Sequence, residues 1–473
     1  MTRLTILHTN DLHGRVEQVL RIAALARQIK HEVEASGGYC VLWDAGDAED
    51  TILYESSITK GRAMMAILHG AGYELEALGN ASPSRYGPQS VAGLADGFGR
   101  RLLCANMIDP ATGQLVDGLE PYTLREFADI KVGIIGLTAV MRNYATFFKL
   151  QLREPVEVLP ALIAEVREHG AQTIVLLSHL GSKQDSALAE QLEGLDVIIG
   201  AQDHVELNPP LMVRHTIIAQ AGDYGRFLGR LDLDLDSHTG QVAHYRGELI
   251  PVAEDLPIDP AAQRAYDVQQ AYVQQFTTRI IGTATHPIDL AHDRECAAGN
   301  LLADALRERM QGEVGLALSG HWQSELPSGD LSLSMLYDAC RSTANPGVAM
   351  LTGNQIQQFL HEALKPDNMQ KSPTGQRGVP IGMPHVSGMR LYYDPARLDT
   401  LDVEIDREAL RPDRLYRVAA SDMELSDFIG YLTLPHESVT YELPTIMPEV
   451  LEDFLARHSP IGPWDQRFFF LEE

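Results

Sequence analysis

The sequence of 473 residues predicts an α/β domain followed by an α+β domain. Its length exceeds that of one ordinary domain. In the first half, short apolar runs alternate with segments of helical spacing, whereas the second half has a different rhythm. Pro, Asp and Glu gather between the halves at residues 251–260. We therefore expect a first domain at 1–255, a linker helix at 256–279 and a second domain at 280–473.

Apolar, often β-branched runs mark the strands of the first domain. The expected strands cover residues 4–7, 39–43, 131–137, 173–177 and 197–199. Apolar residues at helical spacing predict helices over 17–33 and 156–168. Strands that alternate with helices in this way are typical of a layered α/β domain.

The second half begins with a polar, Gln-rich helix over 261–279, which has few apolar anchors and is expected to connect the domains. Further helices are expected over 300–311 and 353–364, with strands near 390–393 and 417–420. This mixture predicts an α+β domain. Residues 366–384 are rich in Pro, Gly and Gln and are expected to form a long loop.

The chain is strongly acidic, with a formal net charge of −27. Such a surface repels nucleic-acid polymers and anionic lipid, so we expect neither a nucleic acid nor a membrane as partner. A small anionic substrate stays compatible with this charge if metal ions reverse the field locally. The four cysteines form no CxxC pair, so we expect reduced thiols and no cysteine zinc site.

The N-terminal segment lacks the apolar core of a signal peptide, because His8, Asn10 and Asp11 interrupt it. No apolar run approaches the ~20 residues that span a bilayer. From these two features we expect a cytoplasmic protein.

Polar motifs follow the expected strands of the first domain. Asp11 and His13 stand two positions apart after the first strand, so both side chains of an extended segment can reach one metal ion. Asp47 follows the second strand in D-A-G-D, where Gly46 permits a tight turn. Asn80 follows a Gly and offers an amide oxygen.

Two further motifs place His179 and His204 just beyond β-branched strands. Any one of these motifs alone is more often a polar loop, an Asx turn or a solvated histidine. All five, however, stand at the carboxyl ends of expected strands, the edge where α/β sheets hold ligands. Together they predict a ligand site.

The order D-x-H, D-x-G-D, G-N, S-H-L-G and G-x-x-x-H resembles the calcineurin-like metallophosphatases, and more narrowly the 5'-nucleotidase and UDP-sugar hydrolase family. Residues 103–107, 131–138 and 295–306 are similar to segments of that family. The resemblance implies a four-layer αββα metallophosphatase sandwich, followed by an α+β domain of the 5'-nucleotidase C-terminal type that binds substrate.

The resemblance also implies two divalent metal ions and a phosphoester hydrolase activity on a small anionic substrate such as a nucleotide. One metal would be held by Asp11, His13 and His204, and the other by Asn80, His179 and Gln202. Asp47 would bridge them, since two cations ~3.5–4 Å apart need a shared anionic ligand. Mixed nitrogen and oxygen ligands suit Mn, Zn or Fe.

The chain departs from the family at three positions of this site. Ala81 and Ser84 stand where the family has a histidine and an aspartate that assist the leaving group. General acid catalysis is worth roughly 10²–10⁴-fold, so a poor leaving group should suffer most. Gln202 replaces a histidine and is a weaker neutral donor. Arg85 or His8 could substitute for this missing pair, but nothing in the sequence places either at the phosphate.

The second domain departs as well. Gln323 stands where the family has a substrate-binding arginine, and Met383 and Met423 stand where two phenylalanines clamp the nucleobase. Methionine gives a less ordered stack than phenylalanine. Three aromatic residues nearby offer another platform: Trp322, Phe428 and Tyr431.

Three functions are compatible with these departures. The first is an active dimetal phosphoesterase with an altered substrate. The second is a catalytically silent protein that binds a metal or ligand, because several acid and substrate positions change together. The third is a hydrolase of non-phosphate, sulfur-containing esters. We favour the first because most of the implied metal ligands are present and metals alone supply several kcal/mol of stabilisation.

Overall fold

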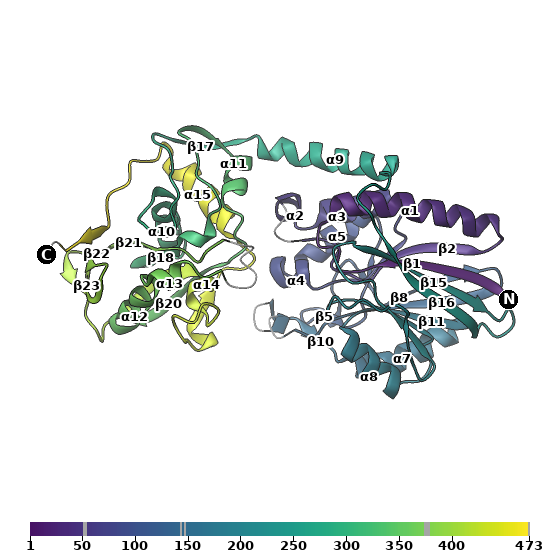
Figure 1. Cartoon of the computed structure of the whole chain (residues 1–473). Helices are drawn as coiled ribbons and strands as arrows, with labels where there is room; N and C mark the ends of the chain where they lie inside the picture. Colours follow the sequence, from purple (N-terminus) through teal and green to yellow (C-terminus); the bar gives the residue numbers. More distant parts are fainter. Residues whose placement is uncertain (51–53, 142–143, 146–147, 373–378, 472–473) are drawn as a thin grey trace. The chain divides into compact units, whose positions relative to one another are not determined.

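The computed structural model describes residues 1–50, 54–141, 144–145, 148–372 and 379–471 (Figure 1). The chain divides into two compact units, Met1–Val273 (unit 1) and Gln274–Glu473 (unit 2). The division falls within helix α9 (Pro260–Thr277), close to the connecting helix expected from the sequence. Among the described residues, no helix is both long enough and apolar enough to cross a membrane.

Unit 1 contains two large sheets. The first has the order β16 (Val242–Pro251), β15 (Phe227–Leu235), β1 (Thr2–Thr9), β2 (Tyr39–Asp44) and β3 (Leu75–Glu76). The second has the order β13 (Leu211–Val213), β14 (Thr216–Ala219), β12 (Val197–Gly200), β11 (Thr173–His179), β9 (Ile130–Thr138) and β8 (Tyr122–Phe127). Strands β1, β2 and β3 of the first sheet are parallel, as are β14, β12, β11 and β9 of the second, so the carboxyl ends of these strands lie at one edge of each sheet. Strand β15 pairs antiparallel with β1.

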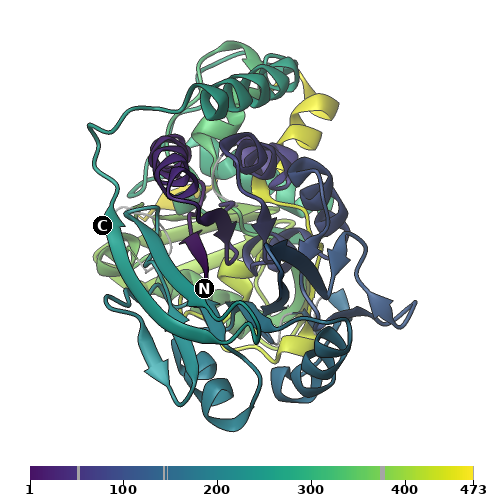
Figure 2. The same ribbon diagram turned by 90° about the vertical axis from the view of Figure 1, so that its right-hand side faces the viewer.

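Side-chain alternation along the strands builds the layers. In β1, Leu4 and Ile6 point into a core between the sheets, whereas Leu7 points to the opposite face. That face is covered by α1 (Val16–Ala35), α3 (Arg62–Ala71) and α5 (Gln89–Phe98). The outer face of the second sheet is covered by α7 (Pro155–Glu168) and α8 (Ser182–Gln191), as Figures 1 and 2 show. The predicted four-layer αββα sandwich is confirmed.

Short elements surround the sandwich. They are α2 (Tyr54–Thr59), α4 (Ala81–Tyr86), β4 (Leu102–Leu103), β5 (Met107–Asp109), β6 (Gln114–Leu115), β7 (Leu119–Glu120) and β10 (Gln151–Leu152). Of these, α4 matters most for function because it begins directly after Asn80.

Unit 2 is an α+β structure with its own core. Its main sheet has the order β21 (Pro384–Ser387), β18 (Val314–Leu318), β25 (Leu415–Ser421), β20 (Pro346–Thr352) and β26 (Val439–Tyr441). The smaller sheets comprise β24 (Glu408–Ala409), β23 (Arg397–Ile405), β22 (Met389–Asp394) and β27 (Phe468–Phe470), and the pair β17 (Ile280–Ala284) and β19 (Gly329–Ser332). The helices are α10 (Ala297–Arg309), α11 (Leu333–Ala339), α12 (Gly353–Ala363), α13 (Pro366–Met369), α14 (Asp422–Leu425) and α15 (Met447–His458).

The elements that the sequence predicts for unit 2 are confirmed as α10, α12, β22 and β25. The expected long loop at 366–384 instead opens with the short helix α13. Residues 373–378 of that loop lie outside the described residues.

Candidate metal centre

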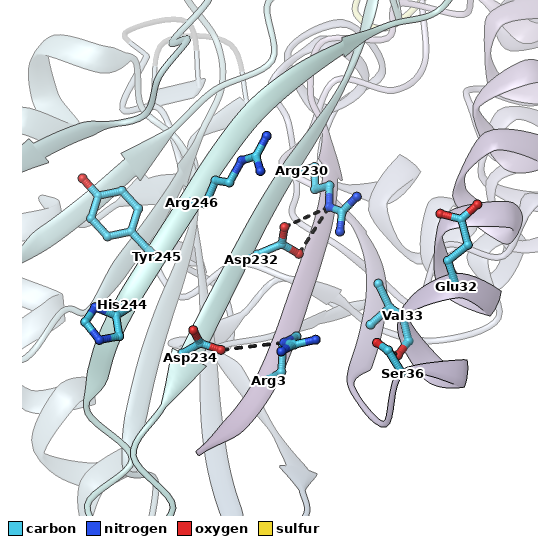
Figure 3. A pocket seen from close by; sticks show the side chains of 10 residues that line it. All are labelled: Arg3, Glu32, Val33, Ser36, Arg230, Asp232, Asp234, His244, Tyr245 and Arg246. Atoms are coloured by element: carbon cyan, nitrogen blue, oxygen red, sulfur yellow. Dashed lines mark hydrogen bonds and ion pairs between the residues drawn. The ribbon is translucent and has the colours of Figure 1, made fainter.

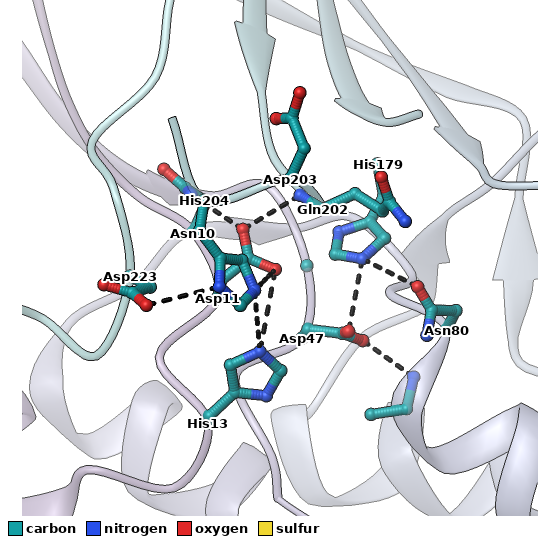
Figure 4. A network of polar contacts seen from close by, with 12 residues as sticks. Asn10, Asp11, His13, Asp47, Asn80, His179, Gln202, Asp203, His204 and Asp223 are labelled. Atoms are coloured by element: carbon teal, nitrogen blue, oxygen red, sulfur yellow. Dashed lines mark hydrogen bonds and ion pairs between the residues drawn. The ribbon is translucent and has the colours of Figure 1, made fainter. Parts of the chain in front are cut away.

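The polar motifs of unit 1 meet at the carboxyl ends of its parallel strands. Asp11 follows β1 and Asp47 follows β2 in the first sheet. His179 ends β11, and His204 follows β12, in the second sheet. Figure 4 shows these side chains pointing toward one another, together with Asn80. The structure therefore brings together residues that are up to 193 positions apart from two different sheets.

Asp11, His13 and His204 form the first group, in which one ligand atom of each lies within 4.8 Å of the others. The Nε2 atoms of the two imidazoles are 3.3 Å apart. Asp11 Oδ1 lies 3.8 Å from His13 Nε2 and 3.6 Å from His204 Nε2. This buried oxygen has no hydrogen-bond partner among the described residues. A buried polar atom of this kind needs a partner, and a cation would provide one.

Asp11, Asp47 and His179 form the second group, again within 4.8 Å. His179 Nε2 lies 3.2 Å from Asp47 Oδ2 and 3.2 Å from the amide oxygen of Asn80. Asp11 is thus the carboxylate that belongs to both groups, whereas the family resemblance assigns the bridging position to Asp47. All three residues of this group are buried.

Hydrogen bonds orient both imidazoles. His179 Nδ1 lies 3.0 Å from the carbonyl oxygen of Ala45, so Nδ1–H donates and Nε2 faces the site. His204 Nδ1 lies 3.2 Å from Asp223 Oδ2, which fixes its ring in the same sense. Asp223 in turn accepts a hydrogen bond from Arg226 Nε at 2.9 Å.

Hydrogen bonds also fix the two carboxylates. Asp11 Oδ2 accepts from Asn10 Nδ2 at 2.8 Å and from the backbone N–H of Gln202 at 2.9 Å. Asp47 Oδ1 accepts from the backbone N–H of Ala81 at 2.8 Å. In each case one oxygen is held and the other faces the histidines.

The backbone of the site adopts rare conformations. Five of the residues concerned have left-handed φ values: Asp11 (50°), His13 (44°), Asp47 (56°), Gln202 (83°) and His204 (59°). Such conformations cost about 1–3 kcal/mol each and cluster at functional sites. A Cβ atom on Gly79 would lie 2.0 Å from Asp47 Oδ1, so only glycine fits beside this carboxylate.

The electrostatics favour a cation. Burial raises the pKa of Asp11, so its charged form is disfavoured without a positive partner. Burial alone would raise the pKa of Asp47, but His179 outweighs burial and lowers it. Burial likewise opposes the charge on His179, yet the carboxylates of Asp47 and Asp11 raise its pKa to about 10. Carboxylate, amide and imidazole donors together fit borderline divalent cations.

The remaining predicted positions of unit 1 contribute less. Gln202 reaches the site through its backbone N–H, and its side chain is exposed. Ala81 and Ser84 are half-buried in α4, and neither residue has an acidic side chain. His8 is buried between the sheets against Gly229, and burial lowers its pKa to about 4. Its place in the core argues against a role as the acid.

The predicted substrate residues of unit 2 are placed differently from the expectation. Met383 and Met423 are only 2% and 8% exposed and pack in the hydrophobic core. Their side chains therefore contact protein atoms, which argues against a base-clamping role. Gln323 is exposed, as is Phe428, whereas Trp322 is fully buried.

A separate hollow of about 390 Å³ lies on the face of the first sheet near β15 and β16 (Figure 3). It is lined by alternating arginines and carboxylates, including the ion pairs Arg3–Asp234 at 3.8 Å and Arg230–Asp232 at 3.0 Å. These charges neutralise one another locally. The hollow also lacks the combination of carboxylates, amide and imidazoles that forms the metal centre.

Sequence reasoning missed Asn10 and Asp223. Asn10 stands inside the first motif, and its position beside Asp11 could have indicated a supporting role. Asp223 lies in a Gly-rich turn after β14, distant in sequence from His204, and no local spacing points to it.

Comparisons with known proteins agree with this geometry. Residues 280–435 match the family model of the 5'-nucleotidase C-terminal domain. This segment of the chain is therefore a 5'-nucleotidase C-terminal domain. It is 24% identical to the uncharacterized metallophosphoesterase YunD of Bacillus subtilis over 96% of this chain and 98% of that protein. It is 25% identical to the 5'-nucleotidase of Vibrio parahaemolyticus over 97% of this chain and 90% of that one.

The fold of the chain also matches a solved structure. The 5'-nucleotidase precursor of Thermus thermophilus superposes with a TM-score of 0.56 at 22% identity, with full coverage of both chains. Several other relatives are longer proteins, of which the chain spans between 36% and 64%.

Proposed function

We propose that this chain is a metal-dependent phosphoester hydrolase of the 5'-nucleotidase family with two divalent cations. The observation that carries the proposal is the convergence of Asp11, Asp47, His179 and His204 at buried and half-buried positions, where Asp11 Oδ1 has no hydrogen-bond partner among the described residues. Relatives named as 5'-nucleotidases and metallophosphoesterases support the reaction class.

In this proposal Asp11, His13 and His204 hold one cation. Asp47, Asn80 and His179 would hold the other, with Gln202 as a weak neighbour, and Asp11 belongs to both groups of donor atoms. Bound cations supply a nucleophile deprotonated at neutral pH and positive charge for the phosphoryl oxygens. The protein residues orient those ligands, since Asp223 and the Ala45 carbonyl hold the imidazole rings.

We propose a small phosphate monoester with a good leaving group as substrate. The half-buried Ala81 and Ser84 cannot donate a proton to a departing alkoxide, so the leaving group should be stable as an anion. A nucleoside monophosphate, the substrate that the names of relatives suggest, has a poorer leaving group and would react more slowly. A non-phosphate sulfur ester is an alternative substrate class.

The same positions also support a second candidate, a catalytically silent protein that binds metal or ligand. The absence of an acid at 81 and 84 and the burial of Met383 and Met423 favour it. The Asp11 oxygen without a hydrogen-bond partner favours an active enzyme over a catalytically silent protein only if metals bind there.

Turnover assays separate these candidates. The purified chain would be assayed with an aryl phosphate and with nucleoside monophosphates, with added Mn²⁺ and with EDTA. The proposal expects Mn²⁺-dependent release of phosphate from the aryl ester, and slower release from the nucleotides. Bound metal without turnover of any ester would favour the silent alternative.

A further inference from the structure

Unit 2 contains a chain of three polar side chains that the metal centre does not use. Ser342 Oγ lies 2.6 Å from His321 Nδ1, and His321 Nε2 lies 2.9 Å from Glu424 Oε1. They come from three segments: the loop after α11, the turn after β18 and helix α14. His321 and Glu424 are 2% and 0% exposed, whereas Ser342 is only half-buried.

Glu424 is held as an ionised acceptor. Its Oε1 accepts from the backbone N–H of Leu318 at 3.0 Å, and its Oε2 from the backbone N–H of Ser421 at 2.9 Å. Burial opposes its charge, but His321 and these hydrogen bonds outweigh burial and lower its pKa. The Ser421 hydroxyl also donates to Oε2.

The direction of each hydrogen bond then follows. Because Glu424 can only accept, His321 must carry its proton on Nε2. When the imidazole is neutral, Nδ1 is an acceptor and Ser342 donates its hydroxyl proton to it. The backbone N–H of Ala344 lies 3.4 Å from the same hydroxyl oxygen and donates to it, which further fixes its orientation.

We propose that Ser342, His321 and Glu424 form a nucleophile, base and orienting acid that cleave activated carboxylic esters without metal. Geometry of this kind defines such a triad regardless of fold or chain order. The oxygen of Ser342 attacks the carbonyl carbon while its proton passes to His321 Nδ1. The C–O bond to the leaving group breaks, and the alcohol departs with that proton. Water then hydrolyses the acyl-serine ester, which returns the hydroxyl of Ser342.

A fluorophosphonate probe tests this directly on the full-length chain in EDTA, where the metal centre is inactive. We expect the probe to modify Ser342, as identified by peptide mass spectrometry. Ser342→Ala should abolish that modification, and His321→Gln should slow it by about 10²-fold or more. Hydrolysis of p-nitrophenyl acetate in EDTA should fall in parallel.

The matched control is Thr343→Ala, which removes the neighbouring hydroxyl of the same loop and should leave labelling unchanged. Circular dichroism checks that each variant is folded. If His321→Gln does not fold, the near-isosteric variant Glu424→Gln serves as a second test. An unlabelled Ser342 in the folded wild-type chain would overturn the proposal. Labelling at the wild-type rate in folded Glu424→Gln would overturn it as well. Neither result depends on the phosphoesterase function.

Discussion

Asp11 is the residue at which stability and proposed function conflict. Its carboxylate is 1% exposed, and one oxygen accepts two hydrogen bonds while the other has no partner among the described residues. Burial raises its pKa, so in the absence of cations the charged form destabilises the folded state. A second buried carboxylate, Asp47, adds to that cost. A bound divalent cation would reverse the balance.

Asp11→Asn should therefore have opposite effects with and without metal. In EDTA the neutral amide keeps the shape and should raise the free energy of unfolding by ~1 kcal/mol. With saturating Mn²⁺ the rise in Tm that we expect for the wild type should be lost. Thermal unfolding with and without Mn²⁺ measures both effects, and Asp234→Asn, in an exposed ion pair, is the control. If Mn²⁺ raised the Tm of the variant as much as that of the wild type, Asp11 would not be a metal ligand.

At the residue scale, the sequence predicted which side chains converge but not their partners. Asp11, His13, Asp47, Asn80, His179 and His204 all lie in the site, because parallel strands bring their carboxyl ends together. Asp223 was not predicted because its contact with His204 depends on the path of a turn. The burial of the two methionines of unit 2 was not predicted, because a linear motif does not tell whether a side chain faces solvent or core.

At the element scale, α4 is the helix that borders the site. The backbone N–H of Ala81 binds Asp47, so the first turn of the helix fixes a proposed metal ligand. Ala81 and Ser84 are three residues apart and share one face of this helix. Positions 81 and 84 of this helix could therefore hold a proton donor, but neither residue there has an acidic side chain.

The double variant Ala81→His and Ser84→Asp should restore an acid on this face. Both positions are half-buried, so the new side chains can reach solvent and substrate. We expect kcat/KM for a nucleoside monophosphate to rise by about 10²-fold, with a much smaller change for an aryl phosphate, because only the poor leaving group needs a proton. Ala81→His alone should give a smaller gain. Equal gains for both substrates would contradict the assigned role.

The turn before α4 should tolerate no added side chain. A Cβ atom on Gly79 would lie 2.0 Å from Asp47 Oδ1 and 2.2 Å from its backbone nitrogen. Gly79→Ala should therefore displace Asp47, lower the free energy of unfolding by ~1–3 kcal/mol and weaken Mn²⁺ binding by about 10-fold or more. Denaturant unfolding and calorimetric titration measure the two effects.

Gly93 supplies the matched control in helix α5, where an added Cβ atom meets nothing within 4 Å. Gly93→Ala should raise the free energy of unfolding by ~0.5–1 kcal/mol through helix propensity and leave metal affinity unchanged. If both glycine variants bound Mn²⁺ equally well, the close packing of Gly79 on Asp47 would not matter for binding.

At the scale of the whole molecule, buried carboxyl groups should set the pH dependence of stability. Asp185 is fully buried, and its Oδ2 has no partner among the described residues. Burial raises its pKa from an unfolded value of 3.8 to about 8. Between these pH values the folded state binds the proton that the unfolded state releases. Stability is therefore lost as pH rises through this window, by at most about 1.4 kcal/mol per pH unit.

Asp185→Asn should remove this dependence. In EDTA, the difference in free energy of unfolding between variant and wild type should grow in favour of the variant from pH 4 to pH 8, and then level off. Urea unfolding at several pH values measures the difference. Parallel curves for the two proteins would show that Asp185 titrates normally.

The overall fold was predictable because its inner strands are continuous apolar runs. Several strands are longer in the structure than the apolar runs predict, and β1, for example, spans Thr2–Thr9 rather than 4–7. The reason is that backbone hydrogen bonds to the neighbouring strand continue through polar residues. The antiparallel pair β15 and β16 was not predicted, although the alternating Leu and Asp of Phe227–Leu235 carry a strand pattern. That pair forms the edge of the first sheet and contributes nothing to the motifs.

The most direct measurement is an anomalous difference map from a crystal of the full chain grown with Mn²⁺. The account predicts two manganese peaks in unit 1, one against Asp11, His13 and His204 and one against Asp47, Asn80 and His179. A map at full Mn²⁺ concentration with no peak among these six side chains would contradict it.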